Sequence, residues 1–277
     1  MAEQQPVVQP IKHEIGRSNF EMARVVVIGD VHDAPGLSKD RLNWIGQYIA
    51  EVQPDKVIQI GDFANLDSMC KYPPQSFDDM ESRPMFVEEE LDSLDEALKA
   101  LNEGLGDFDP SRHVTFGNHE ARLFSGAQRA QEQRAGFGSL AYKIYADTLE
   151  KYGWSFSEYG DIHFVEGVGF VHVPLTKMGK PYGGKTAERQ IAAQSNFDIV
   201  MGHSHEYKLI SEAKIGGDWT RVLNVGCCLP ENHVEEYAKH SNHGWSYGIV
   251  ELSIRDGHIK DHSFTTMEVL EANYGDE

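Results

Sequence analysis

Two short runs of β-branched residues, Arg24–Gly29 and Lys56–Ile60, each lead directly into Gly-Asp. Apolar runs of this length that end at glycine are typical of strands buried on both faces. Between them, apolar residues recur at helical spacing from Leu42 to Ile49, after Ser38, a residue suited to the N-cap of a helix. A strand, a helix and a strand in this order form a right-handed crossover between parallel strands. The chain is therefore expected to begin an α/β fold.

After this first unit, the sequence predicts helices that alternate with strands, and then mainly strands. The spacing predicts helices over residues 85–101, 140–151 and 186–195, and a third short strand over residues 113–116. Further strands are predicted over residues 154–157, 161–165, 168–173, 197–201, 206–211, 221–225, 246–254 and 258–265. Residues 1–20 are polar and without a clear period, so we expect an N-terminal tail. Because no linker interrupts the rest, residues 21–277 are expected to form one domain with two sheets.

Charge and composition exclude several classes of protein. The 44 acidic residues outnumber the 25 basic ones, which gives a net charge of −19 and disfavours binding to double-stranded nucleic acid. No run approaches the roughly 18 apolar residues that a membrane span needs. The first residues lack the pattern of a secretory signal, and three cysteines are too few for a disulfide framework. We therefore expect a cytoplasmic protein without a membrane partner.

Five short polar segments each follow an expected strand. They are Gly29–His32, Gly61–Phe63, Gly117–Glu120, Val171–Pro174 and Gly202–His205. In open α/β sheets, ligands bind beyond the carboxyl ends of the strands, and a glycine there allows a tight turn that exposes the next side chain. Two aspartates, one asparagine and four histidines can then converge. Oxygen and nitrogen donors without sulfur suit Mn, Fe, Zn or Ni better than Ca or Mg alone.

Taken together, these segments resemble the signature of the calcineurin-like metallophosphoesterases: G-D-x-H, G-D, G-N-H-E, a histidine at a strand end, and G-H-x-H. The resemblance extends over about residues 24–227. It implies a four-layer α/β/β/α sandwich of two mixed β-sheets flanked by helices. It also implies a dimetal site at the carboxyl ends of the strands and the hydrolysis of phosphate esters.

The same resemblance implies roles for eight residues of these segments. Asp30, His32 and His205 would hold the first metal ion. Asn118, His172 and His203 would hold the second, and Asp62 would bridge both. His119 would be the general acid that protonates the leaving oxygen, and a hydroxide that bridges the two metal ions would be the nucleophile. The cofactors would be two divalent ions, with Mn as the first choice and Fe, Zn or Ni as alternatives.

One assignment has a competitor nearby in the sequence. His163 also lies in an expected strand, but it falls between Ile162 and Phe164, inside that strand. His172 instead ends an apolar run and is followed by Pro174, so it is expected where the strand ends. We therefore prefer His172 as the ligand.

The stretch Gly61–Asp67, which reads G-D-F-A-N-L-D, departs from the pattern of phosphoprotein phosphatases, G-D-x-x-D-R-G. Asn65 stands where the aspartate that pairs with the catalytic histidine would be, and Leu66 stands where the phosphate-binding arginine would be. Arg122, three residues after His119, is either a replacement for that arginine or a solvated surface residue. The segment Asn224–Cys227 resembles the N-P-G-S of many stand-alone phosphodiesterases of the family.

These departures favour a phosphodiesterase that acts on a small phosphate ester or a nucleotide. The alternatives are a phosphomonoesterase or protein phosphatase, then a nuclease, and then a non-catalytic scaffold of the same fold. The oligomeric state is not predicted.

Three other features of the sequence have more than one interpretation. Residues 179–186 match the P-loop pattern, but the preceding strand ends too early, so the loop is either structural or binds a substrate phosphate through Lys180 or Lys185. Cys227 and Cys228 are expected to be small buried packing residues, with a role as ligands as the alternative. The segment 231–245, which contains His233, His240 and His243, is a surface loop or a wall of the substrate pocket.

Overall fold

The computed structural model describes residues 22–70, 86–123, 132–230 and 244–275, and the expected tail lies outside them. One of its two sheets has six strands in the order β11-β10-β1-β2-β3-β4. Strands β1 to β4 are parallel, whereas β10 is antiparallel to both of its neighbours. The bounds are β1 Ala23–Ile28, β2 Lys56–Gln59, β3 Ser111–Thr115, β4 Trp154–Ser157, β10 Gly248–Arg255 and β11 His258–Thr266.

The second sheet has five strands in the order β5-β6-β7-β9-β8. Its central strands β6, β7 and β9 are parallel, and β5 and β8 pair antiparallel to them at the two edges. The bounds are β5 His163–Val165, β6 Val168–Phe170, β7 Ile199–Met201, β8 Tyr207–Ala213 and β9 Trp219–Val225. Parallel strands in both sheets bring several carboxyl ends together, which is the arrangement that a ligand site at the strand ends requires.

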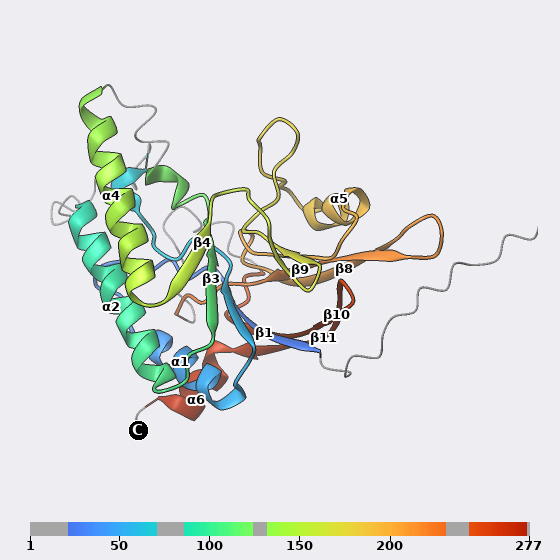
Figure 1. Ribbon diagram of the computed structural model, residues 1–277, viewed down its shortest axis with the longest axis horizontal. Helices are drawn as coiled ribbons and strands as arrows, with labels where there is room; N and C mark the ends of the chain where they lie inside the picture. Colours follow the sequence, from blue (N-terminus) through green and yellow to red (C-terminus); the bar gives the residue numbers. More distant parts are fainter. Residues whose placement is uncertain (1–21, 71–85, 124–131, 231–243, 276–277) are drawn as a thin grey trace, which may run out of the picture.

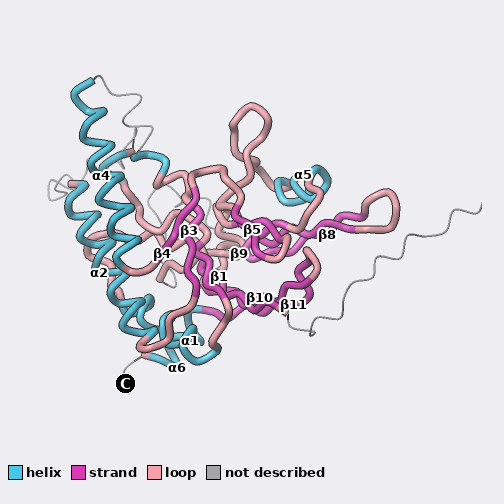
Figure 2. The backbone as a smooth tube through the Cα atoms, viewed as in Figure 1, coloured by secondary structure: helices cyan, strands magenta, loops and turns pink. Residues whose placement is uncertain are grey.

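Helices cover the outer face of each sheet, so the molecule has four layers (Figure 1; Figure 2). Helices α1, α2, α4 and α6 lie against the six-stranded sheet, and α5 lies against the five-stranded sheet. Their bounds are α1 Asp40–Val52, α2 Val87–Leu105, α4 Glu132–Lys151, α5 Ala187–Gln194 and α6 Met267–Tyr274. The α/β/β/α sandwich predicted from the sequence is confirmed.

Strand β1 shows why its sequence is apolar throughout. Val26 and Ile28 pack under the helices, whereas Val25 and Val27 pack against the other sheet. Successive side chains of a strand point to opposite faces, so a strand that is covered on both faces needs apolar residues at every position. Within the described ranges, no helix combines the length and apolar character needed to cross a membrane.

The elements differ from the sequence predictions mainly at their ends. The strand expected over residues 168–173 ends at Phe170, which leaves His172 beyond it. Helix α1 begins at Asp40, and the Ser38 hydroxyl accepts a hydrogen bond from the Asp40 backbone N–H at 3.1 Å. Helix α6 was not predicted. It has only eight residues and follows β11 directly, with the Thr266 side chain as its N-cap.

Candidate metal centre

The strand ends bring all eight residues predicted as ligands or as the acid into one cluster. From the six-stranded sheet come Asp30 and His32 after β1, Asp62 after β2, and Asn118 and His119 after β3. From the five-stranded sheet come His172 after β6, and His203 and His205 after β7. The cluster therefore lies at the edge where the carboxyl ends of strands from both sheets meet.

Asp30, His32 and His205 form the first donor group, and all three are buried. The Nε2 atom of His205 lies 3.1 Å from Oδ2 of Asp30 and 3.1 Å from Nε2 of His32. The donor atoms of the three residues are all within 4.8 Å of one another. A single cation can therefore contact all three.

The second donor group surrounds Nε2 of His172. This atom lies 3.2 Å from Oδ2 of Asp62, 3.1 Å from Oδ1 of Asn118 and 3.3 Å from Nδ1 of His203. Oδ2 of Asp62 is also 4.0 Å from Nε2 of His32, so this carboxylate faces both groups. That is the position expected for a bridging ligand.

Hydrogen bonding and charge prepare His172 for a cation. Its Nδ1–H donates to the Ile60 carbonyl at 3.0 Å, which leaves Nε2 directed at Asp62. Burial lowers the pKa of His172, but the carboxylates of Asp62 and Asp30 outweigh burial and raise the pKa to about 9. The donor cluster therefore attracts positive charge, and its oxygen and nitrogen atoms fit two divalent ions.

The backbone is strained where the ligands project. His32, Asp62, His203 and His205 have φ between 45° and 73°, the left-handed region that side chains rarely adopt. Such outliers cluster at functional sites because the surrounding structure holds them there. Here the strained turns direct several ligands of both donor groups inward.

Two glycines of these segments leave room for a neighbouring carboxylate and do not themselves adopt a turn conformation with a positive φ. A Cβ atom at Gly117 would lie 2.1 Å from Oδ1 of Asp62, and one at Gly202 would lie 2.2 Å from Oδ1 of Asp30. Neither glycine has a positive φ, although Gly61 does. The expected role of glycine in the turn is thus correct for Gly61, whereas Gly117 and Gly202 make room for the carboxylates.

His119 lies beside the cluster, but both of its ring nitrogens have other partners. Nδ1 donates to the Asn65 carbonyl at 2.6 Å, and Nε2 accepts from Nη2 of Arg122 at 3.0 Å. Its donor atom is within 4.8 Å of those of His32 and Asp62, so distance alone permits a ligand. A guanidinium on Nε2, however, repels a divalent ion. The contacts favour the predicted role of His119 outside the coordination shell.

Burial lowers the pKa of His119 to about 3, and the charges of His32 and Arg122 act in the same direction. The carboxylate of Asp62 has the opposite effect but does not outweigh them. His119 therefore lacks a second proton in this arrangement. A phosphate anion beside the ring would favour its protonated form.

Glu120 supports the site, a role that the predictions from the sequence did not include. Its buried carboxylate accepts hydrogen bonds from the backbone N–H groups of Asp62, Phe63 and Gly117 and from the hydroxyl of Tyr145. It therefore joins the turns after β2 and β3. The signal was present as the last residue of Gly-Asn-His-Glu.

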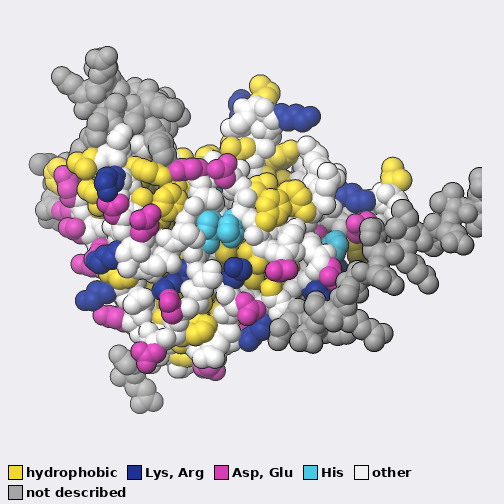
Figure 3. Space-filling view, in the orientation of Figure 1, with side chains coloured by type: hydrophobic (Ala, Val, Ile, Leu, Met, Phe, Trp, Pro, Cys, Tyr) yellow, Lys and Arg dark blue, Asp and Glu magenta, His cyan; other side chains and the backbone are white. Residues whose placement is uncertain are grey.

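Among the described residues, no contact joins Lys185 to the donor cluster. Lys185 lies in the loop before α5, which projects from the molecule (Figure 3). The lysines of this loop and Met178 are exposed. Strand β6 ends at Phe170, well before Gly179, so the strand that a P-loop needs is absent from this described segment. His233, His240 and His243 lie outside the described residues. Cys227 and Cys228 are fully buried, as packing residues would be.

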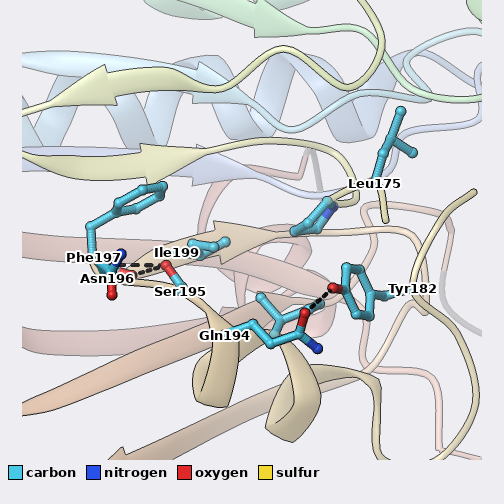
Figure 4. A pocket seen from close by; sticks show the side chains of 9 residues that line it. Leu175, Tyr182, Gln194, Ser195, Asn196, Phe197 and Ile199 are labelled. Carbon is cyan, nitrogen blue, oxygen red and sulfur yellow. Dashed lines mark hydrogen bonds between the residues drawn. The ribbon is translucent and has the colours of Figure 1, made fainter. Parts of the chain in front are cut away.

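A cavity of about 270 Å³ lies between this loop, α5 and the start of β7. Figure 4 shows the Tyr182 hydroxyl at one side of it, donating to Oε1 of Gln194 at 2.8 Å. Its lining residues include none of the predicted ligands. The cavity is therefore separate from the donor cluster.

Comparison with known proteins gives a family match. The family model described as calcineurin-like phosphoesterase matches residues 23–207, about two thirds of the chain. None of the curated proteins matches the chain.

Solved structures that resemble the chain are distant. A dimetal phosphatase from Danio rerio is 11% identical, with 89% of this chain and 97% of that chain covered and a TM-score of 0.42. Vps29 from Entamoeba histolytica, complexed with zinc, is 12% identical, with 87% and 97% covered and a TM-score of 0.35. A predicted phosphoesterase from Streptococcus pneumoniae is 11% identical, with 90% and 92% covered and a TM-score of 0.34.

Proposed function

Because the chain belongs to the calcineurin-like phosphoesterase family, we propose that it is a two-metal phosphodiesterase that hydrolyses small phosphate esters or nucleotides. The observation that carries this proposal is the convergence of seven residues with oxygen or nitrogen donors, Asp62 among them, with His119 beside them and outside the two donor groups. This set combines two sites for divalent cations with a group that can hold a proton for the leaving oxygen.

In this proposal, Asp30, His32 and His205 hold one ion, and Asn118, His172 and His203 hold the other, with Asp62 shared between them. When bound, two divalent ions supply a hydroxide nucleophile near neutral pH and neutralise the charge of the phosphate. Manganese is our first choice, with iron, zinc or nickel as alternatives.

The chain's own residues supply the proton and orient the ester. His119 takes up a proton at Nε2 when a phosphate anion is adjacent, and passes it to the departing oxygen. The Asn65 carbonyl on Nδ1 fixes the orientation of the ring. Arg122 donates to a phosphoryl oxygen from its place beside His119, and Lys185 is a second candidate contact through movement of its exposed loop. The buried thiols of Cys227 and Cys228 agree with a proposed location in the cytoplasm.

The preference for a diester rests on Leu66. This residue stands where phosphoprotein phosphatases have an arginine, and it is fully buried in the hydrophobic core, so its side chain does not reach the ester. A phosphomonoesterase is the second candidate. The Gly-Asn-His-Glu segment is one feature that favours it. Arg122 is another, since its Nη2 atom lies 3.0 Å from Nε2 of His119 and a monoester has an additional terminal oxygen for a guanidinium.

The test compares bis(p-nitrophenyl) phosphate with p-nitrophenyl phosphate in saturating Mn²⁺. We expect kcat/KM for the diester to exceed that for the monoester at least tenfold, and chelation to abolish both activities. A tenfold preference for the monoester would refute the diesterase assignment alone. Absence of metal-dependent turnover on both esters and on nucleotides would refute the proposed function.

A further inference from the structure

Asp67 makes the only ion pair with Arg122 among the described residues. Its Oδ1 atom lies 3.3 Å from Nη1 of Arg122, and the same nitrogen donates to the Asn65 carbonyl at 2.7 Å. The other guanidinium nitrogen, Nη2, contacts Nε2 of His119. We propose that Asp67 is a positioning residue that holds Arg122 where it binds the phosphate of the substrate. This inference rests on the proposed function.

The segment around Asp67 also contacts the first donor group. Oδ2 of Asp67 accepts a hydrogen bond from the Asn65 amide at 2.7 Å, and Oδ1 of Asn65 accepts from Nδ1 of His32 at 3.2 Å. The side chain of Asn65 thus orients a predicted ligand, while its carbonyl orients His119. Arg122 and His32 are therefore fixed by the same short stretch of chain.

The backbone at Asp67 is itself held in place. Its N–H donates to Oε1 of Glu90 at 2.5 Å, and the N–H of Ser68 lies 3.3 Å from Oε2 of the same carboxylate. Glu90 is buried on α2. Asp67 therefore presents its carboxylate to Arg122 from a rigid support, which a positioning role requires.

The contact between Arg122 and His119 explains what this positioning achieves. A guanidinium only donates hydrogen bonds, so Nε2 of His119 accepts from Arg122 and carries no proton in this arrangement. A phosphoryl oxygen is a stronger acceptor and can take over Nη2. Nη1 remains with Asp67 and the Asn65 carbonyl during that exchange. The arginine thus stays next to the phosphate.

A double-mutant cycle tests this role. Asp67→Asn keeps the shape of the side chain and removes its charge, and Arg122→Gln removes the guanidinium. In Mn²⁺-loaded protein, each single variant should weaken the binding of inorganic phosphate about tenfold, measured by calorimetry, and should raise KM for the diester similarly. The double variant should be no weaker than Arg122→Gln, because Asp67 acts through Arg122. Both single variants should retain the Mn²⁺ content of the wild type, and Asp67→Glu should restore part of the affinity.

The control is Asp95→Asn, which removes an exposed ion pair with Lys151 between α2 and α4 and should leave phosphate affinity unchanged. Additive losses in the double variant, or a loss of Mn²⁺ from Asp67→Asn, would overturn the positioning role. Because phosphate affinity is measured without turnover, this result is independent of whether any ester is hydrolysed. Inactivity of the wild type would count against the proposed function, whereas additivity would count against Asp67.

Discussion

His119 is distinguished from its neighbours by what its loss should do. Replacing a ligand lowers metal affinity, whereas replacing an acid slows only the departure of the leaving group. We expect His119→Asn to bind Mn²⁺ as the wild type does and to lose about 10²–10⁴-fold in kcat on a dinucleotide, the usual worth of general acid catalysis. The loss should be much smaller for a p-nitrophenyl diester, because nitrophenolate hardly needs a proton.

Elemental analysis and steady-state kinetics on the two substrates check this prediction. His262→Asn, on β11 and hydrogen-bonded to Tyr207, is a matched control that should change neither result. Loss of metal from His119→Asn would make His119 a ligand. An equal defect on both substrates would exclude its role as an acid.

The sequence predicted well which side chains converge, since each predicted ligand follows a strand end and is identified by its own side chain. That these residues bind metal stays a prediction. The sequence predicted the support of His119 poorly. In the family pattern, an aspartate at position 65 would pair with the histidine that corresponds to His119. Asn65 lacks that carboxylate, yet its main-chain carbonyl contacts His119, and Asp67 and Arg122 form an ion pair close by. A residue pattern compares side chains, so it cannot reveal a role that the backbone has taken over.

At the scale of elements, periodicity predicted most strands and helices because their apolar faces are buried. The ends were less predictable, since capping and the exit of a strand depend on neighbouring turns. Helix α6 lacks a long apolar stripe and is stabilised by packing of Met267 and Leu270 against the six-stranded sheet and α1. Short elements of this kind depend on tertiary contacts that a single sequence does not show.

His113 on β3 and His163 on β5 join the two sheets in a pH-dependent way. Their rings stack with centroids 3.7 Å apart, and Ser155 and Ser157 are hydrogen-bonded to His113. Burial, with the charges of His163 and Lys56, lowers the pKa of His113 from 6.5 to about 4. The folded state therefore binds fewer protons than the unfolded state, so this stack stabilises the fold above about pH 6.5 and loses that contribution as the pH falls towards 4.

We expect the free energy of unfolding of the wild type to fall relative to that of His113→Phe between pH 7 and pH 4. Urea titrations at several pH values measure this difference, and effects of other titrating groups cancel in the comparison. His163→Phe removes the neighbouring charge and keeps a ring. Relative to the wild type, its free energy of unfolding should rise at low pH by less than that of His113→Phe. Parallel stability curves for wild type and His113→Phe would show that the stack does not respond to acid.

For the whole molecule, the site unites the sheets. Asp30, His32, Asp62 and Asn118 follow strands of the six-stranded sheet, and His172, His203 and His205 follow strands of the five-stranded sheet. The layered arrangement was predictable only through the resemblance to a family. The order of the strands is set by pairings far apart in sequence, such as β1 with β10, which local periodicity does not encode.

Because the ligands come from both sheets, binding of the ions should stabilise the entire fold. A ligand at 100 times its dissociation constant contributes about 2.7 kcal/mol to the free energy of unfolding. For a chain of this size each kcal/mol raises Tm by about 2–4 °C. Saturating Mn²⁺ should therefore raise Tm by about 5–10 °C over the chelated protein. The increase should depend on the concentration of Mn²⁺.

Asp62→Asn removes the one carboxylate shared by both donor groups, so the Mn²⁺-dependent increase in Tm should shrink to a small fraction of the wild-type value. Activity should fall at least about 10²-fold, the scale of losing an electrostatic stabiliser. Asp95→Asn, on the exposed face of α2, should keep the full increase and so controls for the loss of a carboxylate. An Asp62→Asn variant that retains the wild-type increase would show that Asp62 does not bridge the ions. Equal Tm values for chelated and Mn²⁺-loaded wild type would show that the cluster does not bind metal across the two sheets.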